Sequence, residues 1–204
     1  AIRQLEEEGY VIEAVRNKGY RLVEDADVLT VAELRSVLDT KWLGQEVDYF
    51  YETDSTNNRA RDAAEKGASH GYLAVADSQT AGKGRRGRVW NSPHGTDIFM
   101  SFLMRPSFGP SQASMLTLVA GMAVVKGVQK ATGLNAMIKW PNDAVVNGKK
   151  ICGILTEMST EEDTIRYVVV GIGINVNARE FPEEIRDKAT SLKLELGRSV
   201  KGCG

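Results

Sequence analysis

The sequence predicts an α+β fold, in which helices pack on one face of a mostly antiparallel mixed sheet. Several short apolar segments have the length and pattern of strands, and two longer stretches have the apolar spacing of helices. Turn signals join consecutive strands in the second half of the chain. Strands joined by short turns pair antiparallel, so a doubly wound parallel sheet is disfavoured.

Residues 1–24 are expected to form part of a winged-helix DNA-binding domain, namely the end of its recognition helix and its wing. A helical pattern opens the chain, and strands at 10–15 and 20–23 flank a turn that contains glycine. Any small α/β appendage is the alternative. Residues 25–30 are interpreted as a linker. The candidate DNA contacts on the wing are the cations Arg16, Lys18 and Arg21.

Two helices and three strands are expected between residues 31 and 104. Thr30 and Glu33 have the spacing of a capping box at the start of the first helix. The run from Asp54 to Asn57 is typical of the cap of the second helix, which Gly67 ends. The strands are expected at 48–53, 72–78 and 96–104.

A long core helix at 115–131 and four more strands are expected in the rest of the chain. The helix has apolar residues at helical spacing, and Asn147-Gly148 predicts a tight hairpin. Trp42 and Trp140 are expected in the core. The strands are expected at 136–140, 144–146, 151–158 and 165–176.

Composition excludes several classes of function. The net charge is −1, so no global field attracts nucleic acid or membranes, and basic chemistry must be local. No apolar run reaches the roughly 18 residues of a membrane span, no signal peptide opens the chain, and two cysteines fit a reducing compartment. We therefore expect a cytoplasmic protein without a membrane partner. His70 and His94 stand alone, without other ligands at metal-binding spacing, so no structural zinc site is expected.

The most distinctive segment is a basic, glycine-rich loop between Gln79 and Trp90. Four cations fall within the six residues from Lys83 to Arg88, interleaved with glycines. Backbone amides and guanidinium groups in such a loop bind polyphosphate, and we expect the loop to order on its ligand. The alternatives are a solvated basic loop and a non-specific nucleic-acid patch.

Two common phosphate-binding motifs fail in this loop. Gly82, Gly84 and Gly87 match the dinucleotide fingerprint G-x-G-x-x-G, but the residues that follow cannot open the required helix. A P-loop needs Lys and then Ser or Thr where Arg88 and Val89 stand. Both motifs are therefore excluded.

Four separate motifs resemble the catalytic domain of bacterial biotin–protein ligases. They occur in the family's order, and the resemblance extends from about Val47 to Leu196. The motifs are Asp54 to Asn57, Gln79 to Trp90, Lys139-Trp140-Pro141-Asn142-Asp143 with the G-x-K segment after it, and Gly171 to Asn177.

The resemblance implies an ATP-dependent, AMP-forming biotin–protein ligase. Such an enzyme converts biotin to biotinyl-5′-AMP and transfers it to a lysine of a biotin carboxyl carrier protein. Residues 31–204 would be its catalytic domain, and the family's C-terminal SH3-like barrel is expected to be absent. The full-length protein would also bind operator DNA as a repressor of biotin genes, which this chain alone is not expected to do. A homodimer is possible in this family.

The resemblance also assigns site residues. Arg85 and Lys150 would be catalytic. Lys83 stands where many relatives have Arg, which we interpret as a tolerated variant. Mg²⁺ is expected with ATP. The biotin-binding residues would be Ser55, Thr56, Asn57, Gln79, Lys83, Gly84, Arg85 and Lys150. The ATP-binding residues would be Gly82, Arg85, Arg88, Lys139, Asn142 and Asn175.

Two other functions remain open at this point. A lipoate or octanoate ligase or transferase of the same superfold also modifies carrier lysines. A protein that is primarily a DNA-binding transcriptional regulator is the other alternative, carried by the basic wing.

Overall fold

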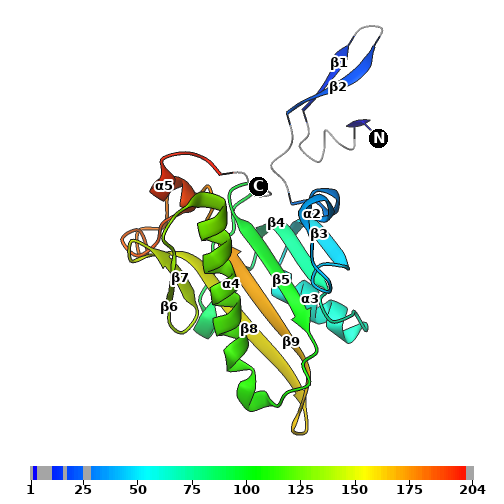
Figure 1. Cartoon of the computed structure of the whole chain (residues 1–204), viewed down its shortest axis with the longest axis vertical. Helices are drawn as coiled ribbons and strands as arrows, with labels where there is room; N and C mark the ends of the chain where they lie inside the picture. The colour runs from blue at the N-terminus through cyan, green and yellow to red at the C-terminus, as the bar shows by residue number, and fades with distance from the viewer. Residues whose placement is uncertain (1, 4–10, 16–17, 25–28, 201–204) are drawn as a thin grey trace.

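The computed structural model describes residues 2–3, 11–15, 18–24 and 29–200 (Figure 1). Strands β1 (Val11–Val15) and β2 (Gly19–Glu24) pair antiparallel in a two-stranded sheet of their own. This confirms the predicted hairpin. Most of the predicted opening helix and of the linker lies outside the described residues, so the winged helix stays a prediction.

The rest of the described chain is built around one seven-stranded sheet with the order β3-β4-β5-β9-β8-β7-β6. All neighbouring strands are antiparallel except β3 and β4, which are parallel. The predicted mixed, mostly antiparallel sheet is confirmed. The strands are β3 (Val47–Thr53), β4 (Leu73–Gln79), β5 (Ile98–Met104), β6 (Met137–Lys139), β7 (Asp143–Val146), β8 (Lys149–Glu161) and β9 (Thr164–Ile174).

The helices begin and end close to the predicted residues. Thr30 accepts a hydrogen bond from the Glu33 backbone N–H at 3.3 Å and so caps the first of them. Gly133, with φ of 77°, ends the long helix in the left-handed conformation that favours glycine. The helices are α2 (Val31–Val37), α3 (Thr56–Glu65), α4 (Ser114–Thr132) and α5 (Leu192–Leu196), with single 3₁₀ turns at Arg85–Gly87 and Pro110–Gln112.

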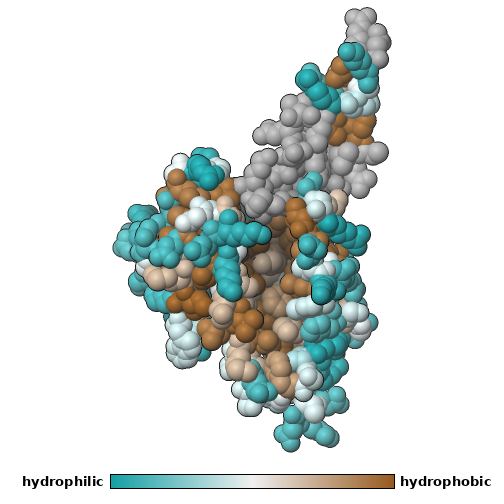
Figure 2. Space-filling model, in the orientation of Figure 1, coloured by the Kyte–Doolittle hydropathy of each residue, from teal (hydrophilic) through white to brown (hydrophobic). Residues whose placement is uncertain are grey.

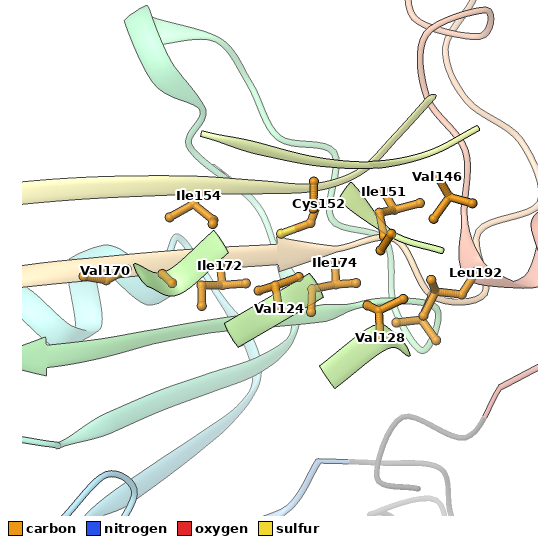
Figure 3. Packing of buried hydrophobic residues seen from close by; sticks show 14 of the residues in the cluster. Val124, Val128, Val146, Ile151, Cys152, Ile154, Val170, Ile172, Ile174 and Leu192 are labelled. Atoms are coloured by element: carbon orange, nitrogen blue, oxygen red, sulfur yellow. The ribbon is translucent and has the colours of Figure 1, made fainter. Parts of the chain in front are cut away.

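The helices cover both faces of the sheet, because successive residues of β9 point to opposite sides. Val168 belongs to the core cluster that includes residues of α4, and so does Val170, which Figure 3 shows. Tyr167 and Val169 pack instead with residues of α3, whereas α2 packs on the same side as α4. The prediction that helices share one face holds for α2 and α4 and is wrong for α3. The parallel β3–β4 pair requires a crossover, and α3 makes that crossover on the opposite face.

The sheet face that carries α4 remains partly apolar on its surface. Figure 2 shows this face, with apolar side chains along α4 and in the hollow beside it. Residues 110–132 are long and apolar enough to cross a membrane by length and composition alone, a test that core helices of soluble proteins also pass. The exposed large apolar residues of α4 are Met115, Leu118, Val119 and Met122.

Two of the tryptophans lie outside the core, contrary to expectation. Trp42 is 44% exposed and stacks against His70, with ring centroids 4.6 Å apart. Trp140 is 82% exposed. It follows β6, the last strand of the sheet, so no further strand covers it.

A truncation at Leu103 tests the packing between the sheet and α3. Leu103 is fully buried and packs in the cluster that contains Ala60 and Ala64 of α3. Leu103→Ala should lower the free energy of unfolding by about 2–5 kcal/mol, because a cavity remains. Leu194→Ala, at a position 49% exposed, is the control and should cost less than about 1 kcal/mol. Urea unfolding followed by circular dichroism measures both, and equal losses would contradict this assignment of the core.

Candidate functional site

A pocket opens on the α3 face of the sheet and encloses about 430 Å³, part of it open to solvent. The start of α3, the end of β4, the basic loop and the strands β8 and β9 meet there. The lining residues are Ser55, Thr56, Asn57, Gln79, Lys83, Gly84, Arg85, Trp90, Asn142, Lys150, Gly153, Ile154, Leu155, Gly171, Ile172 and Gly173.

Three of the strand residues on the floor of the pocket have no side chain. Gly153 and Gly173 are direct partners across β8 and β9, and Gly171 follows on the same face. A Cβ atom at Gly171 would lie 1.9 Å from Asn57 Oδ1, and one at Gly173 would lie 2.6 Å from Trp90 Cε2. The side chains of Asn57 and Trp90 therefore pack directly against the backbone of these glycines.

The family resemblance places Trp90 beside the biotin pocket, and Trp90 lines the pocket here. The floor glycines were not predicted as site residues. Glycine is unusual inside a strand and marks close approach of another group. The alternation of Gly171 and Gly173 with isoleucine in an apolar run carried this signal.

The first residues of α3 are held by Gln79 rather than by a cap of their own. Ser55 is the N-cap residue, but its side chain makes no capping hydrogen bond. The Thr56 backbone N–H instead donates to Gln79 Oε1 at 2.8 Å, and Gln79 Nε2 donates to Ser92 Oγ at 2.9 Å. The interpretation of this run as an ordinary self-capping segment is thus corrected.

Asp54 fastens the turn that precedes α3. Its carboxylate accepts hydrogen bonds from Asn58 Nδ2 at 2.5 Å and from Arg59 Nη2 at 2.8 Å. Burial alone would raise the pKa of Asp54, but these bonds and one from the Ser55 backbone N–H hold it well below its usual range. The Ala81 N–H donates to the Asp54 carbonyl at 2.9 Å. The turn before α3 and the start of the basic loop are therefore joined.

The basic loop folds back on itself beside the pocket. The Trp90 N–H donates to the Gly82 carbonyl at 2.9 Å, and the Gly84 N–H donates to the Arg88 carbonyl at 2.6 Å. Gly82 is buried, and a Cβ there would lie 2.4 Å from Trp90 O. At the tip Arg86 has φ of 60°. The fold-back directs Arg85 to the pocket wall but leaves Arg88 exposed and outside it.

Lys150 stands at the other side of the pocket in a polar and aromatic setting. Its Nζ lies 2.7 Å from Asp143 Oδ1 and 5.2 Å from the centroid of the Trp90 ring. The ion pair and the ring offset the cost of keeping the ammonium group partly buried. The neighbouring Lys149 is exposed and does not line the pocket.

The structure brings together nine of the predicted ligand-binding residues and leaves four outside the pocket lining. Asn142 is inside and donates to the Ile154 carbonyl at 3.1 Å. Asn175 is buried and donates to the Thr190 carbonyl at 3.0 Å, so it connects β9 to the segment before α5. Lys139 is exposed. The four residues outside the lining are Gly82, Arg88, Lys139 and Asn175.

The remaining candidate residues lie on the β1–β2 hairpin. Arg21 is exposed and its Nη2 lies 2.5 Å from Glu13 Oε2. Lys18 is exposed next to the turn, and Arg16 lies outside the described residues. DNA binding by these residues stays a prediction.

Comparison with known proteins matches residues 49–175 to the family described as "Biotin/lipoate A/B protein ligase family". The chain is 46% identical to "Bifunctional ligase/repressor BirA" of Bacillus subtilis (strain 168), covering 100% of this chain and 63% of that protein. It is 38% identical to "Biotin--[acetyl-CoA-carboxylase] ligase" of Paracoccus denitrificans, covering 72% of this chain and 63% of that protein. The chain thus spans under two thirds of the length of these relatives.

Among solved structures, the biotin protein ligase from Aquifex aeolicus in complex with biotin and ATP is similar. Its TM-score is 0.66 at 40% identity, and the match covers 76% of this chain and 62% of that one. This likeness confirms the predicted α+β class of the catalytic-domain fold.

A methyl group added to the floor tests the steric constraint. Gly171→Ala should displace Asn57 and lower the free energy of unfolding by about 1–3 kcal/mol, because the added Cβ overlaps the amide. Gly127→Ala on α4 is the control, since a Cβ there meets nothing within 4 Å. That change should stabilise the helix by about 0.5–1 kcal/mol. Thermal and urea unfolding measure both; a Gly171→Ala protein as stable as the parent would refute the close contact.

Proposed function

The chain belongs to the biotin/lipoate A/B protein ligase family, and on that premise we propose that it is an ATP-dependent biotin–protein ligase. It converts biotin and ATP to biotinyl-5′-AMP and pyrophosphate. It then transfers the biotinyl group to a lysine of a biotin carboxyl carrier protein. One observation carries the proposal: a single pocket joins a neutral hydrogen-bonding end to a cationic end across a glycine floor.

The neutral end suits the ureido ring of biotin. That ring has two N–H donors and one carbonyl acceptor, so it needs fixed acceptors and donors of small size. Ser55 and Thr56 are 2% and 3% exposed, and Gln79 is held at both ends of its amide. The glycine floor lets the apolar bicycle approach the sheet.

The cationic end suits the carboxylate and the phosphates. A biotin carboxylate oxygen attacks the α-phosphorus of ATP, the new C–O–P bond forms, and the bond to the pyrophosphate oxygen breaks. No covalent protein nucleophile is needed, so the protein contributes position and positive charge. Lys150, Lys83 and Arg85 line this part of the pocket. We assign to Arg85 and Lys150 the role of stabilising the negative charge that develops on the phosphoryl oxygens.

The nucleotide extends from this end in our proposal. Asn142 lies at the pocket edge, and Arg88 and Lys139 supply exposed cations near the loop and β6. Among the described residues no three His, Cys, Asp or Glu side chains converge as metal ligands. We therefore assign Mg²⁺ to the MgATP substrate, with phosphate oxygens as its principal ligands.

Transcriptional regulation through DNA binding is part of the proposal for the whole protein. Relatives that match this chain over its full length are named ligase/repressor, and the β1–β2 hairpin carries Lys18 and Arg21. We propose operator binding and a homodimer as properties of the full-length protein, in the cytoplasm.

Mass spectrometry of a carrier domain tests the activity and the lipoate alternative together. The purified protein is incubated with the carrier, MgATP and either biotin or lipoate. A mass gain with biotin that requires ATP and the acceptor lysine is expected. A gain with lipoate alone, or none with biotin in the presence of ATP, would overturn the assignment.

Lys150 and Lys149 form a matched pair for testing the cationic end. Lys150→Met should lower the rate of adenylate formation by about 100-fold or more, because a charge directed at the reacting phosphate is lost. Lys149→Met removes the adjacent exposed cation and should stay within about twofold of the parent. Pyrophosphate release from ATP and biotin measures both variants. Similar losses in the two would show that only bulk charge matters.

A further inference from the structure

A chain of short hydrogen bonds leads from Glu157 on β8 to the neutral end of the pocket. Asn57 Nδ2 donates to Glu157 Oε2 at 2.6 Å. Asn57 Oδ1 lies 2.6 Å from Ser101 Oγ, which lies 2.7 Å from Thr56 Oγ1. The three inner residues are at most 4% exposed, so water does not compete for these contacts.

The Glu157 carboxylate makes the shorter of two contacts that fix the direction of these hydrogen bonds, at 2.6 Å against 3.5 Å for the Leu155 carbonyl, which accepts from the same Asn57 nitrogen. An ionised carboxylate only accepts, so the amide of Asn57 must turn its nitrogen to Glu157 and its oxygen to Ser101. Ser101 has one proton, and at 2.6 Å from a carbonyl oxygen it must place that proton there. The contact of 2.7 Å between Ser101 and Thr56 then needs the Thr56 proton. The reverse order would set the Asn57 carbonyl oxygen against the Glu157 carboxylate, two acceptors 2.6 Å apart.

We propose that Glu157 is a positioning residue that makes Thr56 an acceptor toward the pocket. With its proton committed to Ser101, the Thr56 hydroxyl offers both lone pairs to the ligand. The other acceptor within reach of this proton is Gln79 Oε1, but that contact is longer, at 3.2 Å against 2.7 Å, and Gln79 Oε1 still accepts from the Thr56 backbone N–H at 2.8 Å. The site then favours a ring that carries N–H groups, as the ureido ring of biotin does. This inference rests on the proposed function.

The same device rejects rings without donors. A dithiolane ring, as in lipoate, has no N–H, so the Thr56 oxygen would be left buried and unpaired. Sites built around such groups reject ligands that lack the matching donor far more strongly than apolar pockets reject a missing methylene. Glu157 thus contributes to ligand choice without lining the pocket itself.

Glu157→Gln tests the direction of these hydrogen bonds while the shape of the side chain stays nearly constant. A carboxamide either accepts or donates, so Asn57 can flip and the whole chain can reverse. The Thr56 hydroxyl then accepts a hydrogen bond from Ser101, and its own O–H becomes free to donate toward the pocket. Ser101→Ala is a second variant, for use should the first fold poorly. It removes the middle member of the hydrogen-bond series. Glu161→Gln is the control, because this carboxylate also lies on β8 but is 75% exposed.

The measurement is discrimination between biotin and two lactam analogues, each lacking one ureido N–H. For each protein the ratio of kcat/KM for adenylate formation is compared between biotin and each analogue. The parent should reject at least one analogue by about 100-fold or more. Glu157→Gln and Ser101→Ala should lower that ratio about tenfold and raise the KM for biotin but not for ATP. Glu161→Gln should retain the parent ratio.

The outcomes separate this inference from the proposed function. If the parent forms no adenylate from biotin, the proposed function fails. If it does, but Glu157→Gln keeps the parent ratio, the directional role is wrong. Equal weakening toward biotin and both analogues would show a packing role only and would also overturn it.

Discussion

The site depends on a steric constraint, namely that the two strands beneath it carry glycine at three neighbouring positions of one face. These positions are Gly153, Gly171 and Gly173. Because strand residues alternate, the same strands point Ile154 and Ile172 into the core under α4 (Figure 3). Glycine costs conformational entropy in a strand. Here the apolar packing on the opposite face offsets that cost, so one pair of strands serves both stability and binding.

Rigid connections then bring segments far apart in sequence to this floor. Gln79 ties the end of β4 to the first turn of α3 and, through Ser92, to the return of the basic loop. At the other end of α3, Arg105 Nη2 donates to the Ala64 carbonyl at 2.8 Å. The helix is thus held at both ends by the strands around it. Such mutual support is what keeps small polar groups in a binding geometry.

The local elements of this structure could be predicted from the sequence, whereas most of its long-range contacts could not. Strand and helix positions follow from periodicity, and the Asn147-Gly148 turn from backbone preference, with both residues at positive φ. The face chosen by α3 could not be predicted, because it depends on the parallel crossover from β3 to β4. Nor could the Glu157–Asn57 contact, which joins residues 100 positions apart. The family motif at Gly171 to Asn177 contains two of the floor glycines, but the motif alone did not indicate that they form the pocket floor.

The two ends of the pocket offer different kinds of interaction to a ligand. At the neutral end, buried hydroxyl and amide groups hold fixed positions, so selectivity comes from the cost of an unpaired group. At the charged end, the cations lie on a folded-back loop or, like Lys150, in an ion pair with Asp143. With a net charge of −1 for the chain, this positive field is local. Under the proposed function, a ligand with a neutral ring and an anionic tail would therefore fit in one orientation only, with its carboxylate toward the phosphates of ATP.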